Sequence, residues 1–195
     1  MATGGLALAS ELMAASVAPP LDFDTWMRGE QRRVFLLCVR ILRDADEADM
    51  AAQDSFLKAY RYFSGGAEVP VGDLGKWITR VAVNTCLDRL RSRSWKFWRR
   101  RPPAEAESAA LMLVADQGPS AEDRARARDI QRRLSEALDK LSPRQRAIFV
   151  LKHYEDRKLD EISQTLGLEV GTVKAHMARA VARLRTELAD LYEGV

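Results

Sequence analysis

The first candidates for chemistry are Cys38, Cys86, His153 and His176, because thiols and imidazoles serve as nucleophiles, general bases and metal ligands. The two cysteines are far apart without CxxC spacing, and each falls on the apolar side of a predicted helix. No set of acid, base and nucleophile converges on them, as a reaction requires. The sequence therefore predicts no enzyme, metal site, disulfide framework or cofactor.

A local block of positive charge gives a stronger signal. Residues 77–101 carry eight basic side chains and one acidic one, whereas residues 21–76 carry eight and ten. The block also contains Trp77, Trp95, Phe97 and Trp98. Cationic groups attract phosphates and aromatic rings stack on bases, so the block predicts a nucleic-acid partner. A solvated basic helix end is the alternative that charge alone leaves open.

Composition and periodicity then describe the elements that must position these groups. The chain has 195 residues, 30% of them charged, and no apolar run approaches the roughly 18 residues of a membrane span. Residues 1–20 lack a basic start and carry Glu11, so no secretory signal is predicted. These features predict a cytoplasmic protein without membrane insertion.

The pattern is all-α, with two small helical domains joined by a flexible linker. The first module covers residues 21–98 and the second covers residues 129–195. The linker, residues 99–128, contains Pro102-Pro103 and Gly118-Pro119, which interrupt helical periodicity. Residues 1–20 form an N-terminal extension.

The first module contains three predicted helices. The first covers residues 21–42, and the second covers residues 46–63 with Asp46 as its N-cap. Ala48, Ala52, Phe56, Ala59 and Phe63 form the core face of the second helix. Its opposite face carries Met50, Gln53, Asp54, Leu57 and Arg61. That face either receives a partner protein or is covered by a neighbouring helix, and the pattern leaves both open.

A loop is predicted over residues 64–75, and a third helix over residues 77–92. Arg80, Asn84, Leu87 and Arg91 share one stripe of this helix, which is expected to face solvent. Guanidinium groups suit phosphates and an amide suits base edges, so the stripe predicts a nucleic-acid surface. An ion-paired surface helix is the alternative.

The second module contains a predicted helix-turn-helix. Ser142, Pro143 and Gln145 form a capping box that starts a helix, and helices over residues 159–166 and 170–191 follow with Gly167 at the turn. Val173, Met177, Ala180, Leu184 and Leu188 form the predicted buried side of the long helix. Its outer face carries Thr172, Lys174, Ala175, Ala178 and Arg179. Small side chains between cationic ones suit the major groove of DNA, although a hairpin used only for dimerisation is the alternative.

At this point the chain resembles the bacterial extracytoplasmic-function (ECF, group 4) sigma factors over about residues 21–192. The family pattern Asp-x-x-x-Gln-x-x-Phe matches Asp49, Gln53 and Phe56, and WITRVAVNTCLDRLRSR resembles its promoter-opening helix. LSPRQRAIFVLKHYEDRKLDEISQTLGLEVGTVKAHMARAVARLR resembles its C-terminal domain. The resemblance implies that the chain directs promoter-specific transcription initiation, with core RNA polymerase, promoter DNA and an anti-sigma factor as partners.

The resemblance also implies roles for residues. Core polymerase would bind at sigma region 2 through Asp49, Met50, Gln53, Asp54 and Leu57. The minus-ten element would meet Trp77, Arg80, Asn84, Asp88 and Arg91. The minus-thirty-five element would be read at sigma region 4 by Thr172, Lys174, Ala175, His176, Ala178 and Arg179.

Some residues depart from the family pattern. Glu155-Asp156-Arg157-Lys158 stands where Glu-Gly-Leu-Ser is usual, which loses a serine cap, and Lys174-Ala175-His176 stands where Arg-Ser-Arg is common. A LuxR-type helix-turn-helix regulator, which shares Gly-Thr-Val-Lys at residues 171–174, is the alternative. The N-terminal half lacks the alternating β and α pattern of a receiver domain.

Overall fold

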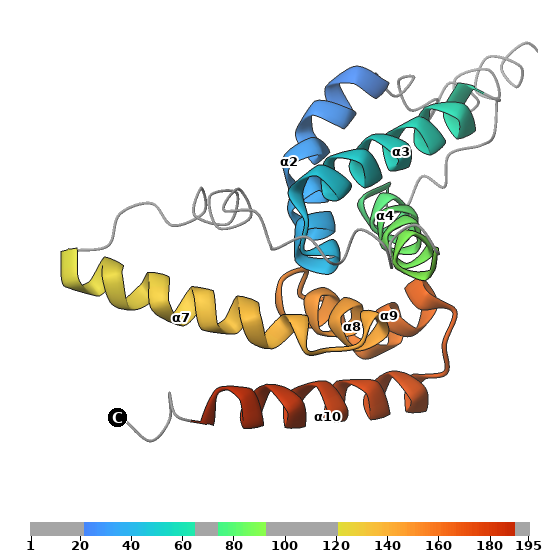
Figure 1. Ribbon diagram of the computed structural model, residues 1–195. Helices are drawn as coiled ribbons and strands as arrows, with labels where there is room; N and C mark the ends of the chain where they lie inside the picture. The colour runs from blue at the N-terminus through green and yellow to red at the C-terminus, as the bar shows by residue number, and fades with distance from the viewer. Residues whose placement is uncertain (1–21, 65–73, 93–120, 190–195) are drawn as a thin grey trace, which may run out of the picture.

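The computed structural model describes residues 22–64, 74–92 and 121–189, with only the backbone for residues 121–128 and residue 131. The described residues form seven helices and no strand, so the all-α prediction is confirmed (Figure 1). None of those seven helices is long and apolar enough to cross a membrane. The N-terminal extension, most of the predicted linker, and the ring-bearing residues Trp95, Phe97 and Trp98 lie outside the described residues.

The first two helices have well-defined ends. Helix α2 (Phe23–Leu42) begins after Asp22, whose Oδ1 accepts a hydrogen bond from the Asp24 N–H at 3.2 Å. Helix α3 (Ala45–Ser64) follows Asp44, whose Oδ1 accepts from the Glu47 N–H at 2.9 Å. The predicted N-cap at Asp46 is therefore wrong, because Asp44 bonds the free N–H and Asp46 lies inside the first turn.

Helix α4 (Leu74–Arg91) begins earlier than the predicted Trp77, so Leu74 and Gly75 are helical and were wrongly assigned to the loop. Its first turn is held by contacts to the Gly75 carbonyl oxygen, which accepts from Thr79 Oγ1 at 2.7 Å and from Arg33 Nη2 of α2 at 3.2 Å. A long-range contact thus stabilises a helix start that glycine disfavours locally.

The second module comprises α7 (Ala121–Asp139), α8 (Pro143–His153), α9 (Leu159–Leu166) and α10 (Val170–Glu187). Helix α7 occupies the last part of the segment predicted as linker, and α10 ends before the predicted Leu191. The capping box of α8 is confirmed: Ser142 Oγ accepts from the Gln145 N–H at 3.4 Å, and Gln145 Oε1 accepts from the Ser142 N–H at 3.0 Å. Gly167 ends α9 with φ of 61°, the left-handed conformation in which glycine avoids strain.

The two modules pack against each other. Helix α8 contacts α2 and α4, and α9 contacts α4, as the central part of Figure 1 shows. The same apolar core includes Leu37 and Ile78 of the first module and Ile148, Leu151 and Ile162 of the second. A smaller core joins α7, α8 and α10 around Leu138, Leu141 and Leu184.

Candidate protein and nucleic-acid interfaces

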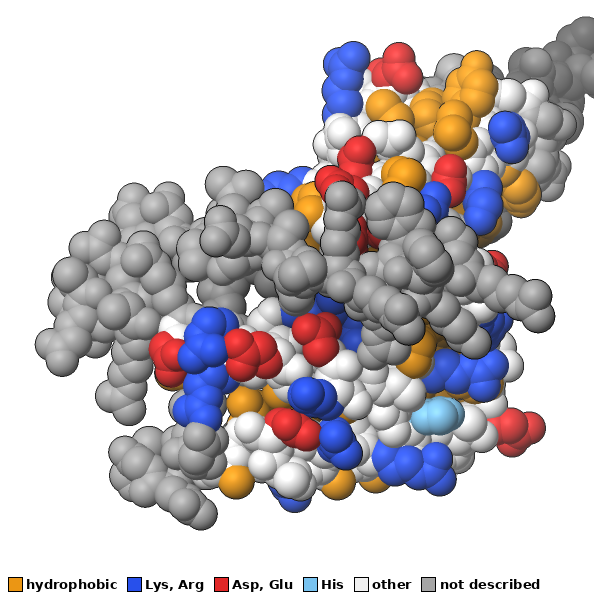
Figure 2. Space-filling model, viewed as in Figure 1, with side chains coloured by type: hydrophobic (Ala, Val, Ile, Leu, Met, Phe, Trp, Pro, Cys, Tyr) orange, Lys and Arg blue, Asp and Glu red, His pale blue; other side chains and the backbone are white. Residues whose placement is uncertain are grey.

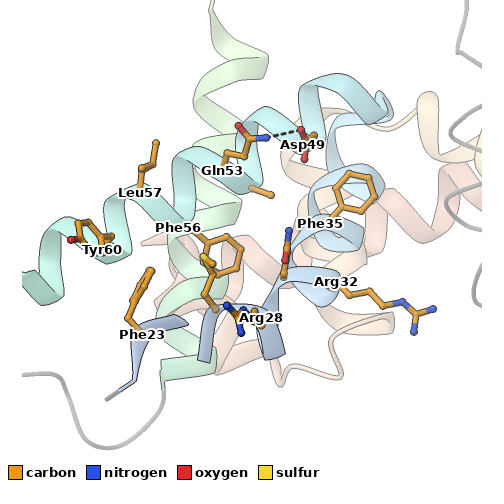
Figure 3. A pocket seen from close by; sticks show the side chains of 12 residues that line it. Phe23, Arg28, Arg32, Phe35, Asp49, Gln53, Phe56, Leu57 and Tyr60 are labelled. Atoms are coloured by element: carbon orange, nitrogen blue, oxygen red, sulfur yellow. Dashed lines mark hydrogen bonds between the residues drawn. The ribbon is translucent and has the colours of Figure 1, made fainter. Parts of the chain in front are cut away.

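A groove of about 790 Å³ lies between α2 and α3 (Figure 3). Its lining is largely apolar and includes the rings of Phe23, Phe35 and Phe56. Arg28 and Arg32 of α2 also line it. On α3, Gln53 Nε2 donates to Asp49 Oδ2 at 2.7 Å, which fixes both polar groups beside the apolar lining. Binding sites for proteins typically combine an apolar surface with a few polar groups held in fixed positions, and this groove has both features.

Large apolar side chains of α3 remain exposed beside the groove. Met50 is 42% exposed and Leu57 is 52% exposed, and Tyr60 is also exposed. Among the described residues no helix covers Met50 and Leu57, so the alternative that a neighbouring helix covers this face is wrong. Figure 2 shows hydrophobic side chains gathered over this upper part of the molecule.

The five residues predicted to bind the polymerase lie in different places in the structure. Asp49, Gln53 and Leu57 line the groove, whereas Met50 is exposed outside it. Asp54 instead reaches α4, where its Oδ2 accepts from Arg89 Nη2 at 2.6 Å.

The groove also contains residues that the sequence argument missed, namely Phe23, Arg28, Arg32, Phe35 and Tyr60. The sequence does contain a sign of the position of Phe35. This large apolar residue follows Val34 and lies about 100° away from it around the helix, so both cannot point directly into the same core. It is only half-buried, unlike Val34.

The face of α4 predicted to meet nucleic acid is mostly exposed. Arg80, Asn84, Asp88 and Arg91 are all exposed, and Arg91 Nη1 lies 3.4 Å from Asp88 Oδ1. Trp77 is half-buried, with its ring centroid 5.2 Å from that of Tyr62 and 5.7 Å from that of Phe63.

One residue of the stripe predicted on the third helix does not face solvent. The side chain of Leu87 is only 5% exposed. It lines a hollow together with Asn84 of α4 and Leu166 and Leu168 of the second module. The prediction that Leu87 faces solvent is therefore wrong, because the second module packs against this side of α4.

The long helix α10 has the predicted two sides. Val173, Ala180 and Leu184 are buried, and Met177 and Leu188 are half-buried. Thr172, Lys174, Ala175, Ala178 and Arg179 are exposed, and cationic side chains appear along this lower edge in Figure 2.

His176 differs from its neighbours on the outer face, because it is half-buried. Burial, with smaller effects from the charges of Arg179 and Arg144, lowers the pKa of His176. The neutral imidazole is therefore favoured at neutral pH.

The turn into α10 is closed by local bonds. Ser163 Oγ donates to the Leu168 carbonyl oxygen at 2.6 Å, and the Leu168 N–H donates to the Ser163 carbonyl oxygen at 3.0 Å. Lys158 provides no side-chain cap for α9, in agreement with the loss of the family serine. The Glu161 carboxylate nevertheless accepts from the Lys158 N–H at 3.0 Å.

The cysteines are fully buried core residues of α2 and α4, as predicted. Burial, together with contact with Cys38, raises the pKa of the Cys86 thiol, which keeps it protonated. Within the part of the chain that the structure describes, no cluster of three or more His, Cys, Asp or Glu residues could hold a metal ion.

Comparison with known proteins identifies the class. The family model described as Sigma-70 region 2 matches residues 26–96, and that described as Sigma-70, region 4 matches residues 131–184. The ECF RNA polymerase sigma factor SigM of Mycobacterium tuberculosis is 34% identical over 187 residues, covering 95% of this chain and 87% of that protein. SigW of Bacillus subtilis, also an ECF sigma factor, is 29% identical over 165 residues, covering 82% and 84%.

Two solved structures share the fold. The sigma factor RpoE in complex with the anti-sigma factor NepR, from Bartonella quintana, has a TM-score of 0.61 at 18% identity, covering 86% of this chain and 97% of that one. CnrH in complex with the cytosolic domain of CnrY has a TM-score of 0.58 at 20% identity, covering 94% and 96%.

The chain therefore belongs to the ECF sigma factors of RNA polymerase. It binds core RNA polymerase and promoter DNA and directs promoter-specific transcription initiation. The family is not enzymatic, and the two matched regions do not favour a LuxR-type regulator.

Proposed function

We propose that this sigma factor, of ECF group 4, divides its function among three surfaces. The groove between α2 and α3, with the neighbouring face of α3, binds core polymerase. The exposed face of α4 binds the minus-ten element, and the outer face of α10 reads the minus-thirty-five element. The observation that carries this proposal is the apolar groove beside the exposed side chains of Met50 and Leu57.

The polymerase surface comprises Asp49, Met50, Gln53, Asp54 and Leu57. Leu57 supplies apolar area at the centre of the contact. The hydrogen-bonded polar groups of Asp49 and Gln53 determine how the partner is positioned on this surface. Asp54 lies toward α4 and acts at the edge of this surface.

The minus-ten surface comprises Trp77, Arg80, Asn84, Asp88 and Arg91. The Asn84 amide can donate to and accept from a base edge, whereas the two arginines attract the phosphate backbone. Asp88 pairs with Arg91 and orients its guanidinium. Contacts to an extruded base offset the few kcal/mol of unstacking, so binding energy drives strand opening.

The minus-thirty-five surface comprises Thr172, Lys174, Ala175, His176, Ala178 and Arg179. The alanine methyl groups let the helix approach the bases closely, and Lys174 and Arg179 reach base edges or phosphates on either side.

The domain limits and partners complete the proposal. Residues 21–98 act as sigma region 2 and residues 129–195 as sigma region 4, joined by the linker 99–128 and preceded by the extension 1–20. The protein acts in the cytoplasm. An anti-sigma factor is a further partner, since both structural neighbours were solved with proteins of that kind or with a partner's cytosolic domain.

Titration with core polymerase tests the groove assignment. Leu57→Lys should weaken binding by a few kcal/mol, because a desolvated unpaired charge replaces apolar contact. Gln53→Ala should weaken binding less. Ile130→Lys on α7 is the matched control, since Ile130 is 45% exposed and lies far from the groove along the chain. Equal core affinity for Leu57→Lys and Ile130→Lys would remove the assignment.

A further inference from the structure

The groove between α2 and α3 has a defined length and two distinct ends. Phe23 and Tyr60 lie at one end, with ring centroids 5.4 Å apart, and Phe35 and Asp49 lie at the other (Figure 3). On α3, the stretch from Asp49 to Tyr60 measures about 17 Å, at 1.5 Å per residue. The apolar lining is therefore as long as three helical turns, so a helix of that length fits along it.

A segment of matching length and composition comes just before the groove in the sequence. Residues 1–21 lie outside the described part of the chain, and α2 begins at Phe23, which lines the groove. Residues 6–17 include four alanines and five large apolar side chains, namely Leu6, Leu8, Leu12, Met13 and Val17. Alanine, leucine and methionine favour helix formation. A helix over these 12 residues is about 18 Å long, close to the length of the groove.

The apolar side chains of this segment lie all round the predicted helix. At 100° per residue, Leu6, Met13 and Val17 share one side, whereas Leu8 and Leu12 lie on the opposite side. A helix that is apolar on both sides requires cover by other apolar surface. The groove offers such cover within the same chain, where the free-energy cost of bringing two separate molecules together does not arise.

Two prolines determine the direction in which the segment enters. Pro19 and Pro20 interrupt a helix, and Pro19 disfavours helical conformation at the residue before it, so the predicted helix ends near Val17. The connection from Val17 to Asp22 spans up to about 17 Å when extended. That length allows the chain to reverse at the Phe23 end of the groove, and the segment then runs antiparallel to α2.

Charge gives an independent argument for this placement. Glu11 is the only charged side chain among residues 1–20, and it lies about 9 Å along the predicted helix from Val17. Arg28 and Arg32 both line the groove, about 8 and 14 Å along α2 from Phe23. With Val17 level with Phe23, Glu11 lies between the two guanidinium groups. Asp49, the acidic residue of the groove lining, is at the far end.

We infer that residues 6–17 bind as a helix in the α2–α3 groove of their own chain, antiparallel to α2, and compete there with core polymerase. The docking follows from the groove and the segment, whereas the competition rests on the polymerase surface proposed above. The same groove residues cannot contact both occupants at once. The apparent affinity for core polymerase is therefore reduced by the fraction of molecules in which the groove is open.

Maleimide modification of the thiol introduced by Leu57→Cys tests the docking in the full-length protein. Leu57 lines the groove and is exposed among the described residues, while Cys38 and Cys86 are fully buried. The native segment should slow modification at least about ten-fold relative to a double-aspartate variant, Leu12→Asp with Met13→Asp. This variant places a charge on each side of the predicted helix, so neither side can enter the apolar groove.

Two controls accompany this measurement. Ala2→Asp with Thr3→Asp adds the same charge outside residues 6–17 and should keep modification slow. The thiol introduced by Ile130→Cys, on α7, should react at the same rate in every background. Equal rates at position 57 for the native segment and the double-aspartate variant overturn the docking. Protection that grows with protein concentration assigns the segment to a second copy of the chain and overturns docking within one chain.

A charge exchange tests the position of Glu11. Glu11→Lys should speed modification at position 57 about two- to five-fold, the range that an exposed ion pair supports. Adding Arg28→Glu should restore part of the protection, because opposite charges then meet again. Arg144→Glu is the matched control, since Arg144 is exposed on α8 and should restore none. Equal effects of Arg28→Glu and Arg144→Glu overturn the placement of Glu11 beside Arg28.

Titration with core polymerase, without promoter DNA, tests the competition. The double-aspartate variant should bind about ten-fold more tightly than the wild type, and Ala2→Asp with Thr3→Asp should match the wild type. Equal affinity of the wild type and the double-aspartate variant overturns the competition. The labelling experiment contains no polymerase, and Leu57→Lys tests the polymerase surface by itself. A failure of the docking is therefore distinguishable from a failure of the proposed polymerase surface.

Discussion

Arg146 Nη1, on α8, donates a hydrogen bond of 3.0 Å to the carbonyl oxygen of Ile41, near the end of α2. The same guanidinium donates from Nε to the Leu138 carbonyl oxygen at 3.0 Å. The buried guanidinium thus donates to carbonyl groups near the C-terminal ends of two helices. The partial negative charge at such a helix end favours a cation there. Arg146 is therefore an anchor of the fold, although it lies in a basic stretch of sequence.

Replacing Arg146 with Met should lower the free energy of unfolding by about 2–4 kcal/mol, because several buried carbonyl oxygens lose their donor. Arg144→Met is the control, since Arg144 is exposed and should change stability by under about 0.5 kcal/mol. Urea unfolding measures both values. Equal stability of the two variants would show that the buried guanidinium makes no net contribution.

The start of α8 has a side-chain cap and the start of α9 lacks one, so substitutions at the two N-cap residues can be compared. Ser142→Ala should cost about 1 kcal/mol, since Ser142 Oγ accepts from the Gln145 N–H. Lys158→Ala should cost under about 0.5 kcal/mol, because Lys158 caps α9 without a side-chain bond. Thermal unfolding of both variants checks this order, and a larger loss for Lys158→Ala would contradict it.

These two helix starts show what sequence can predict and what it cannot. Ser142 and Gln145 act on neighbouring backbone groups, so a local pattern predicted their bonds correctly. The burial of Leu87 depends on contact with a module that is distant in sequence, and the buried guanidinium of Arg146 bonds carbonyl groups of its own module and that of Ile41 in the first module. Local periodicity contains no information about either arrangement. The same holds for the groove, since the sequence predicted its α3 side but missed the rings that α2 contributes.

Salt dependence should separate the roles of Asn84 and Arg91 in promoter binding. Arg91→Ala should reduce the slope of log affinity against log salt by about 0.9, because one phosphate contact is lost. Asn84→Ala should leave the slope unchanged but weaken binding at every salt concentration, since a base contact survives screening. Permanganate footprinting should then show reduced thymine reactivity in the minus-ten region for Asn84→Ala. Normal reactivity counts against a role of Asn84 in strand opening.

Substitutions on α10 should change minus-thirty-five recognition while leaving the fold intact, because the residues concerned are exposed. Ala175→Phe or a bulky residue at Ala178 should abolish recognition by steric exclusion. Lys174→Ala should relax preference at one or two base pairs by about 1–3 kcal/mol, if its contact is to a guanine edge.

Arg179→Ala should weaken binding more evenly across sequences. Competition against a randomised minus-thirty-five library measures all of these variants. Identical sequence preferences for the wild type, Ala175→Phe and Lys174→Ala would show that this helix does not read DNA.

The bond between Asp54 and Arg89 has a thermodynamic consequence. Arg89 Nη2 donates to Asp54 Oδ2 at 2.6 Å, so a carboxylate of α3, the helix proposed to bind core polymerase, is a counter-ion of a guanidinium of α4, the helix proposed to bind the promoter. A ligand that changes the state of this pair from one side changes the affinity for the ligand on the other side by the same factor, because such coupling is reciprocal. On the surfaces proposed for these two helices, the binding of promoter DNA and the binding of core polymerase are coupled to the extent that each ligand perturbs the ion pairs of Arg89.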